Sequence, residues 1–155
     1  MDLIQFQQNL KNIRFNDILD DAIVAKEESL LNHNKMQLMF GKGTDGDDLG
    51  DYVYDWYAEH KSKYFPNYHA PYGVYNFYKF GSFYDAMYAR PLLTAIEVSS
   101  TDDKTGYLEK LAGWGNKKLG GQRTFGLTKE NIPEYAQGDL KPEIIKRLKE
   151  AMFKE

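Results

Sequence analysis

The stretch LLTAIEVS, residues 92–99, is the most strand-like segment of a chain of 155 residues. Its side chains alternate between two faces, with Ile96 and Val98 on one and Glu97 on the other. This alternation of aliphatic, β-branched and polar residues is typical of a β-strand. The segment therefore predicts one strand of a small antiparallel sheet.

A long amphipathic helix is predicted before this strand, over residues 1–33. Apolar residues recur there at spacings of three and four, and neither proline nor glycine interrupts residues 1–40. Asn16 or Asp17 could cap its second half. Residues 36–40 then alternate between apolar and polar side chains, which predicts a short strand.

Three helices are predicted after the strand, each with a capping residue: Thr101 or Asp102 for one that runs to about residue 111, Thr128 for one over residues 130–136, and Asp139 for the last. The order of elements predicts an α+β fold, in which the long N-terminal helix and the C-terminal helices pack on a small antiparallel sheet. The length fits a single domain over residues 1–155.

Composition and charge exclude several classes of protein. The chain has no cysteine, which excludes a disulfide scaffold, a thiolate metal site and a cysteine nucleophile. A net charge of −3 argues against a protein that coats nucleic acid by charge alone. The first ten residues lack a basic and then apolar leader, and no apolar run reaches a membrane span of about 18 residues. We therefore expect a soluble intracellular or assembly-borne protein without a membrane partner.

Aromatic residues gather in one part of the chain. Fifteen of the 23 aromatics lie between Tyr52 and Tyr88, and residues 64–80 form a tyrosine-rich segment with loop-like proline and glycine. Tyrosine suits interfaces, because its ring is apolar and its hydroxyl is polar. We expect a surface for a neighbouring subunit or partner; an aromatic core and a stacking platform for sugars or bases are the alternatives. The interface candidates are Tyr72, Tyr75, Phe77, Tyr78, Phe80 and Phe83, whereas Trp56 and Trp114 are expected in the core.

The segment GKGTDGDDLGD, residues 41–51, combines glycines with acids. Its literal G-x-G-x-x-G does not indicate a nucleotide site, because Asp47 and Asp48 would repel phosphate. The carboxylates between Asp45 and Asp51 could hold a cation weakly. A solvated turn is the favoured interpretation, and we predict neither a metal site nor a cofactor.

Catalytic motifs are missing from the sequence. His33, His60 and His69 are the only histidines and lack zinc-ligand spacing, and there is no G-x-S-x-G motif. We therefore do not expect an enzyme. The rival in this class is a metal-dependent hydrolase that uses the acidic residues 45–51 and a histidine.

Charge is unevenly distributed. Residues 41–60 carry one lysine against six acids, whereas residues 61–123 carry nine basic and five acidic residues. The pattern fits ordinary surface scatter, or two complementary patches such as a head-to-tail ring contact requires.

Three stretches carry a resemblance to a known group of proteins: MQLMFGKGTDGDDLGDY (residues 36–52), FYKFGSFYDAMYA (residues 77–89), and STDDKTGYLEKLAGW with TFGLTKENIPEYAQGDLKPEII (residues 100–114 and 124–145). Their order resembles small virion proteins of tailed phages and prophages of Bacteroidetes-type hosts, crAss-like phages among them. GSF at residues 81–83 and FGLT at residues 125–128 stand where that group has its G-x-F segment and its turn. The layout is also similar in outline to tail-completion or neck proteins.

The resemblance implies a virion structural protein of the neck or tail, in a homo-oligomeric ring that joins the portal to the tail. Its partners would be its own copies and portal, connector or tail proteins, and DNA would pass through the lumen without specific binding. The protein would be found in the virion, and in the host cytoplasm during assembly. The alternative is a monomeric tail-associated module that recognises host glycan through Tyr72, Tyr75 or Tyr78.

Overall fold

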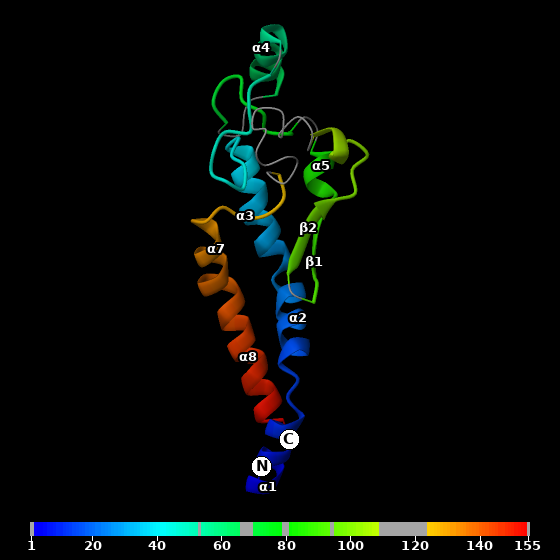
Figure 1. The fold of residues 1–155 in the computed structure, drawn as a ribbon, viewed down its shortest axis with the longest axis vertical. Helices are drawn as coiled ribbons and strands as arrows, with labels where there is room; N and C mark the ends of the chain where they lie inside the picture. The colour runs from blue at the N-terminus through cyan, green and yellow to red at the C-terminus, as the bar shows by residue number, and fades with distance from the viewer. Residues whose placement is uncertain are drawn as a thin grey trace.

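The computed structural model describes residues 2–52, 54–65, 70–78, 81–93, 95–108 and 124–154. The elements are α1 (Leu3–Asn12), α2 (Phe15–Ala25), α3 (Glu27–Met39), α4 (Asp55–Tyr64), α5 (Ser82–Asp85), β1 (Met87–Pro91), β2 (Ile96–Ser100), α7 (Asn131–Glu134), the π-helix η1 (Tyr135–Leu140) and α8 (Lys141–Met152). Helices and a two-stranded antiparallel sheet confirm the α+β fold. The molecule is elongated, with α1 at one end and α4 at the other (Figure 1).

The N-terminal region is three helices, so the prediction of one long helix over residues 1–33 is wrong. The backbone is extended at Ile13 and Arg14, which separates α1 from α2, and Lys26 leaves helical geometry between α2 and α3. Neither break involves proline or glycine. α3 continues to Met39, which makes the predicted strand at residues 36–40 helical.

Burial explains why α3 extends so far. Its buried residues recur at spacings of three and four and face the core along the whole helix: Leu30, Leu31, Asn34, Gln37 and Leu38. Packing of this face outweighs the local alternation of residues 36–40, because tertiary contacts override weak local preferences.

The sheet is a β-hairpin in which Met87 pairs with Ser100 and Pro91 with Ile96. The predicted strand at residues 92–99 thus begins four residues later, at Ile96. Leu92 belongs to the turn, where its N–H donates to the carbonyl oxygen of Ala95 at 2.8 Å. β1 packs against α2 and α3.

The C-terminal helices form one continuous helical rod from α7 through η1 to α8. Thr128 caps it as predicted, since its Oγ1 accepts the N–H of Asn131 at 3.2 Å. Helical structure already exists at Asp139, which was expected to open the last helix. α8 lies along α2, and Arg147 Nη1 lies 3.6 Å from the Asp21 carboxylate. Within the described residues, no helix is long and apolar enough to cross a bilayer.

Candidate functional site

The aromatic segment supplies much of the core. Aromatic rings contact one another in a series from Tyr75 to Phe77, Phe83 and Phe125, with centroid separations of 6.4, 5.6 and 5.8 Å. Tyr52 joins this series through Tyr75, at 4.6 Å. The series runs from Phe125 in the FGLT turn to Tyr52, which contacts Tyr57 of α4.

The predicted interface residues therefore differ in how far they are buried. Tyr75, Phe77 and Phe83 are buried, because they pack with Leu38 and Leu49 in the core cluster. For these three, the expectation of a surface position is wrong, and the alternative of an aromatic core holds. Of the remaining candidates, Tyr78 is half-buried, Tyr72 is 67% exposed, and Phe80 lies outside the described residues.

Trp56 is exposed, not buried as predicted. It is 65% accessible on α4 and stacks on Tyr54 with centroids 6.2 Å apart, and Tyr64 on the same helix is exposed too. The physical reason is the position of α4 at the far end of the molecule (Figure 1). Trp114 lies outside the described residues. We call Tyr54, Trp56 and Tyr64 the aromatic tip.

The buried tyrosine hydroxyls stay protonated at neutral pH. Burial raises the pKa of Tyr52 and of Tyr84 above the ordinary range, and Tyr84 donates to the carbonyl oxygen of Asn76. Burial, with the carboxylate of Asp139, raises the pKa of Tyr135 to about 12. None of these shifts moves a group toward neutral pH, where acid–base catalysis would use it.

The glycine–acid segment is a tight loop whose ends are fixed in the core. Lys42 forms a bridge to Asp48, with Nζ 2.7 Å from the carboxylate, and Leu49 is fully buried. Gly41 has φ +72°, and a Cβ there would lie 2.6 Å from Val74 Cγ1. Its backbone conformation and its packing therefore both favour glycine at this position.

In the described part of the chain, the histidines that a metal-dependent hydrolase would use contact residues outside the acidic segment 45–51. His33 Nε2 lies 3.5 Å from Asp139, His60 packs beside Tyr64 and Phe65, and His69 lies outside the described residues. Across the described part of the chain, no three His, Asp or Glu side chains are grouped as metal ligands.

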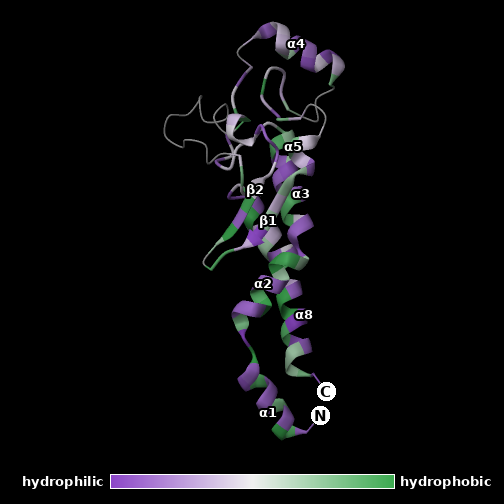
Figure 2. Cartoon of the chain, turned by 90° about the vertical axis from the view of Figure 1, so that its right-hand side faces the viewer, coloured by the Kyte–Doolittle hydropathy of each residue, from purple (hydrophilic) through white to green (hydrophobic). Residues whose placement is uncertain are grey.

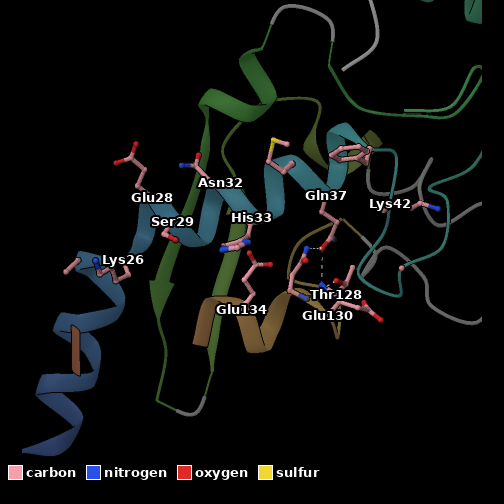
Figure 3. Close-up of a pocket in the computed structure, with 15 residues that line it drawn as sticks. Lys26, Glu28, Ser29, Asn32, His33, Gln37, Lys42, Thr128, Glu130 and Glu134 are labelled. Carbon is pink, nitrogen blue, oxygen red and sulfur yellow. Dashed lines mark hydrogen bonds between the residues drawn. The ribbon is translucent and has the colours of Figure 1, made fainter. Parts of the chain in front are cut away.

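An open groove of about 820 Å³ separates α3 from residues 128–134. Figure 3 shows His33 and Gln37 of α3 on one side and Thr128 and Glu134 on the other. At its upper part, Gln37 Oε1 accepts the N–H of Thr128 at 2.9 Å. The lining mixes acids, lysines, amides and apolar side chains, which indicates a solvated groove rather than an enclosed small-molecule pocket.

Asn34 and Gln37 bind the FGLT turn to α3. Asn34 Nδ2 donates to the carbonyl oxygens of Thr124 and Gly126, at 3.1 and 2.8 Å. Gln37 Nε2 adds a bond to Gly126 at 3.3 Å. We call this set the amide latch. Sequence reasoning missed it, although buried amides at i and i+3 on the core face of α3 were the available signal.

The two ends of the chain form a second exposed feature, the terminal arm, made of α1, α8 and Phe153. Neither α1 nor α8 has a buried residue, although apolar and polar side chains alternate along both (Figure 2). Leu3 and Ile4 are 71% and 68% exposed. The contacts that hold α1 are the stacking of Phe6 on Phe153, at 5.7 Å, and hydrogen bonds from Asn9 to the carbonyl oxygens of residues 152 and 154.

Comparison with known proteins gives no match: no protein family, curated protein or solved structure is similar to this chain.

Proposed function

We propose that this chain is a structural subunit of a tailed-phage virion, which assembles with its own copies into a ring of the neck or tail and lines part of the DNA passage. The observation that carries the proposal is the terminal arm, which has an apolar surface that its own chain leaves uncovered. The resemblance of residues 36–52, 77–89, 100–114 and 124–145 to small virion proteins supplies the setting.

The arm has the properties of a subunit contact. Leu3 and Ile4 are neighbours on α1, which packs against the end of α8. Covering each of these two side chains in an assembly would contribute about 1.5–3 kcal/mol. Folding of the monomer leaves Leu3 and Ile4 of this amphipathic helix largely exposed, whereas a neighbouring subunit would cover them.

A closed ring needs two different surfaces on every subunit, because its contacts are head-to-tail. Apolar residues are also exposed on other helices, away from α1: Val24 on α2, Ile132 on α7 and Ile145 on α8. These residues supply a second surface that the arm of the next copy could meet.

Recognition of a host glycan is a second candidate, and one observation favours it. Tyr75 is buried, so Tyr72, Tyr75 and Tyr78 do not form a common stacking surface. The aromatic tip instead presents Trp56 stacked on Tyr54, and exposed indole faces bind sugar rings. Loss of glycan binding in Trp56→Ala would support this candidate.

Electron microscopy of the purified protein tests the ring. The double variant Leu3→Gln, Ile4→Gln removes the apolar surface of α1, and Gln7→Asn, Gln8→Asn is a matched control on exposed polar positions of the same helix. We expect rings from the wild type and the control and none from the double variant, with equal thermal stability of the dissociated subunits of all three in dilute protein. Rings that persist in the double variant would contradict the role of the arm.

A further inference from the structure

The hydrogen bonds of the hairpin fix which backbone groups point outward. Leu92 N–H donates to the Ala95 carbonyl oxygen and Thr101 N–H to that of Ala86, at 2.8 and 3.1 Å. In an antiparallel pair, hydrogen-bonded positions alternate with positions whose backbone groups point away. The register therefore directs the N–H and C=O groups of Ile96, Val98 and Ser100 on β2, and of Met87, Ala89 and Pro91 on β1, away from the hairpin.

The outer edge of β1 is closed. Its central outward N–H, that of Ala89, donates to Glu27 Oε1 at 2.9 Å. The outward residue at its end is Pro91, which has no N–H to offer. β1 also packs against α2 and α3, and Figure 2 shows it between β2 and α3. Proline and a covering helix are two ways in which proteins block strand edges.

The outer edge of β2 is open. Among the described residues, no group bonds to the outward N–H and C=O of Ile96 or Val98, and β2 itself contains neither proline nor lysine. Ser100, at the end of the strand, is only 8% exposed, and Thr105 Oγ1 donates to its carbonyl oxygen at 3.2 Å, so the open part of the edge is at Ile96 and Val98. A two-stranded sheet with an open edge gains stability from a further strand.

We propose that β2 pairs with β2 of a second copy, in antiparallel orientation about a twofold axis at Val98. The closed edge of β1 leaves β2 as the strand of the hairpin that a second copy can offer. A register of Val98 opposite Val98 pairs the outward groups of the two Val98 residues with each other and places Ile96 opposite Ser100, where Thr105 Oγ1 already takes one lone pair of the carbonyl oxygen. The result is a four-stranded sheet across two chains.

Charge favours this register over its neighbour. With Val98 opposite Val98, Glu97 lies opposite Ser99 of the second copy, and each Glu97 keeps its ion pair with Arg90 in its own chain. A shift that centres the axis on Glu97 would set two carboxylates directly opposite each other, which is destabilising.

The same register accounts for an exposed leucine. Leu93 is 97% exposed at the hairpin turn, and Figure 2 shows this turn standing clear of α2. Antiparallel pairing about Val98 sets the hairpin turn of one copy beside the end of β2 in the other, where the helical turn of residues 105–108 follows. Tyr107 in that turn is exposed as well, so the pairing brings two uncovered apolar side chains together.

This contact goes beyond the ring, because a twofold contact is distinct from the head-to-tail contacts of a cyclic assembly. It joins two copies in solution and protects an edge that would otherwise attract unrelated strands.

Amide hydrogen exchange of the wild type, followed by NMR at increasing protein concentration, tests the pairing. The amides of Glu97 and Ser99 face β1 and should be protected at every concentration. The amides of Ile96 and Val98 should exchange rapidly in dilute protein and become protected as the dimer forms. Rapid exchange at Val98 in concentrated protein would overturn the proposal.

Three variants test the register by sedimentation. Val98→Pro removes an N–H that the hairpin itself does not use, and the dimer dissociation constant should rise about tenfold or more. Ser99→Glu, opposite Glu97 of the second copy, should weaken the dimer, whereas Ser99→Lys should tighten it. Equal effects of Ser99→Glu and Ser99→Lys would contradict the register without any dependence on how Val98→Pro folds.

The two proposals fail separately. A dimer that persists in Leu3→Gln, Ile4→Gln and is lost in Val98→Pro supports the strand pairing even if no ring forms. Rings in which the Val98 amide exchanges freely support the ring and overturn the strand pairing.

Discussion

The side chain of Asn34 and the backbone of Gly126 form a reciprocal pair. Nδ2 donates to the Gly126 carbonyl oxygen at 2.8 Å, and Oδ1 accepts the Gly126 N–H at 3.4 Å. Asn34 is fully buried, and Gly126 has φ +120°, a conformation that glycine adopts readily. α3 and the FGLT turn, 92 residues apart in the chain, are joined through this pair.

Asn34→Ala should lower the free energy of unfolding by about 2–3 kcal/mol, because it leaves the buried carbonyl oxygen of Thr124 without its donor and leaves that of Gly126 with only the longer bond from Gln37. Asn32→Ala is the matched control, on an exposed position of the same helix, and should change stability by less than about 0.5 kcal/mol. Urea denaturation measures both. Equal stability of the two variants would show that the latch does not hold the turn.

Gly41→Ala should destabilise the protein more than Gly46→Ala. Both glycines have positive φ, so each alanine costs about 1 kcal/mol in backbone strain. Only at Gly41 does the new Cβ meet a core atom, Val74 Cγ1 at 2.6 Å, whereas nothing lies within 4 Å of a Cβ at Gly46. The difference between the melting temperatures of the two variants measures the cost of the close contacts at Gly41. Equal melting temperatures would contradict the packing of Gly41 against Val74.

Alanine substitutions should distinguish buried from exposed aromatic residues by their effect on the free energy of unfolding. Phe83→Ala should lower the free energy of unfolding by about 3–5 kcal/mol, since Phe83 is buried among other aromatic rings. Tyr72→Ala, at an exposed position, should have almost no effect on unfolding. Chemical denaturation of both variants checks this, and a large loss in Tyr72→Ala would contradict its surface position.

Stability should fall in alkaline solution. The pKa of Tyr135 is raised to about 12 in the folded protein from 10 in the unfolded chain. The unfolded chain therefore loses this proton more easily, so the free energy of unfolding is at its full value below pH 10 and falls as the pH rises toward 12. The pKa values of Tyr52 and Tyr84 are raised as well, which acts in the same direction. Unfolding measured between pH 9 and 12 should show the decline, with a smaller decline in Tyr135→Phe.

Tyr135→Phe should also leave stability at neutral pH unchanged or slightly higher. The buried hydroxyl of Tyr135 has no hydrogen-bond partner among the described residues, so its removal ends an uncompensated desolvation. A loss of more than about 1 kcal/mol in this variant at pH 7 would reveal a bond to the hydroxyl.

The sequence was a good guide where local pattern and tertiary packing agree. The strand at Ile96 and Val98 and the cap at Thr128 follow from alternation and capping chemistry, which act within a few residues. The breaks at Arg14 and Lys26 could not be predicted, because ordinary helix-forming residues leave helical geometry there and neither proline nor glycine marks the positions.

The surfaces were harder to predict than the fold. Composition cannot distinguish Tyr75, which closes the core, from Tyr72 three residues earlier, which faces solvent. Trp56 has the chemistry of a core residue and lies on a helix that the fold carries away from the core. The open edge of β2 depends on the phase of the hairpin hydrogen bonds, which only the register of β1 and β2 defines.

The molar mass in solution, measured by light scattering across a concentration series, tests the central claim most directly. The account predicts that the wild type reaches a closed oligomer larger than a dimer and that Leu3→Gln, Ile4→Gln does not. A wild type that stays monomeric or dimeric at every concentration, with the same mass as the double variant, would contradict self-assembly through the terminal arm.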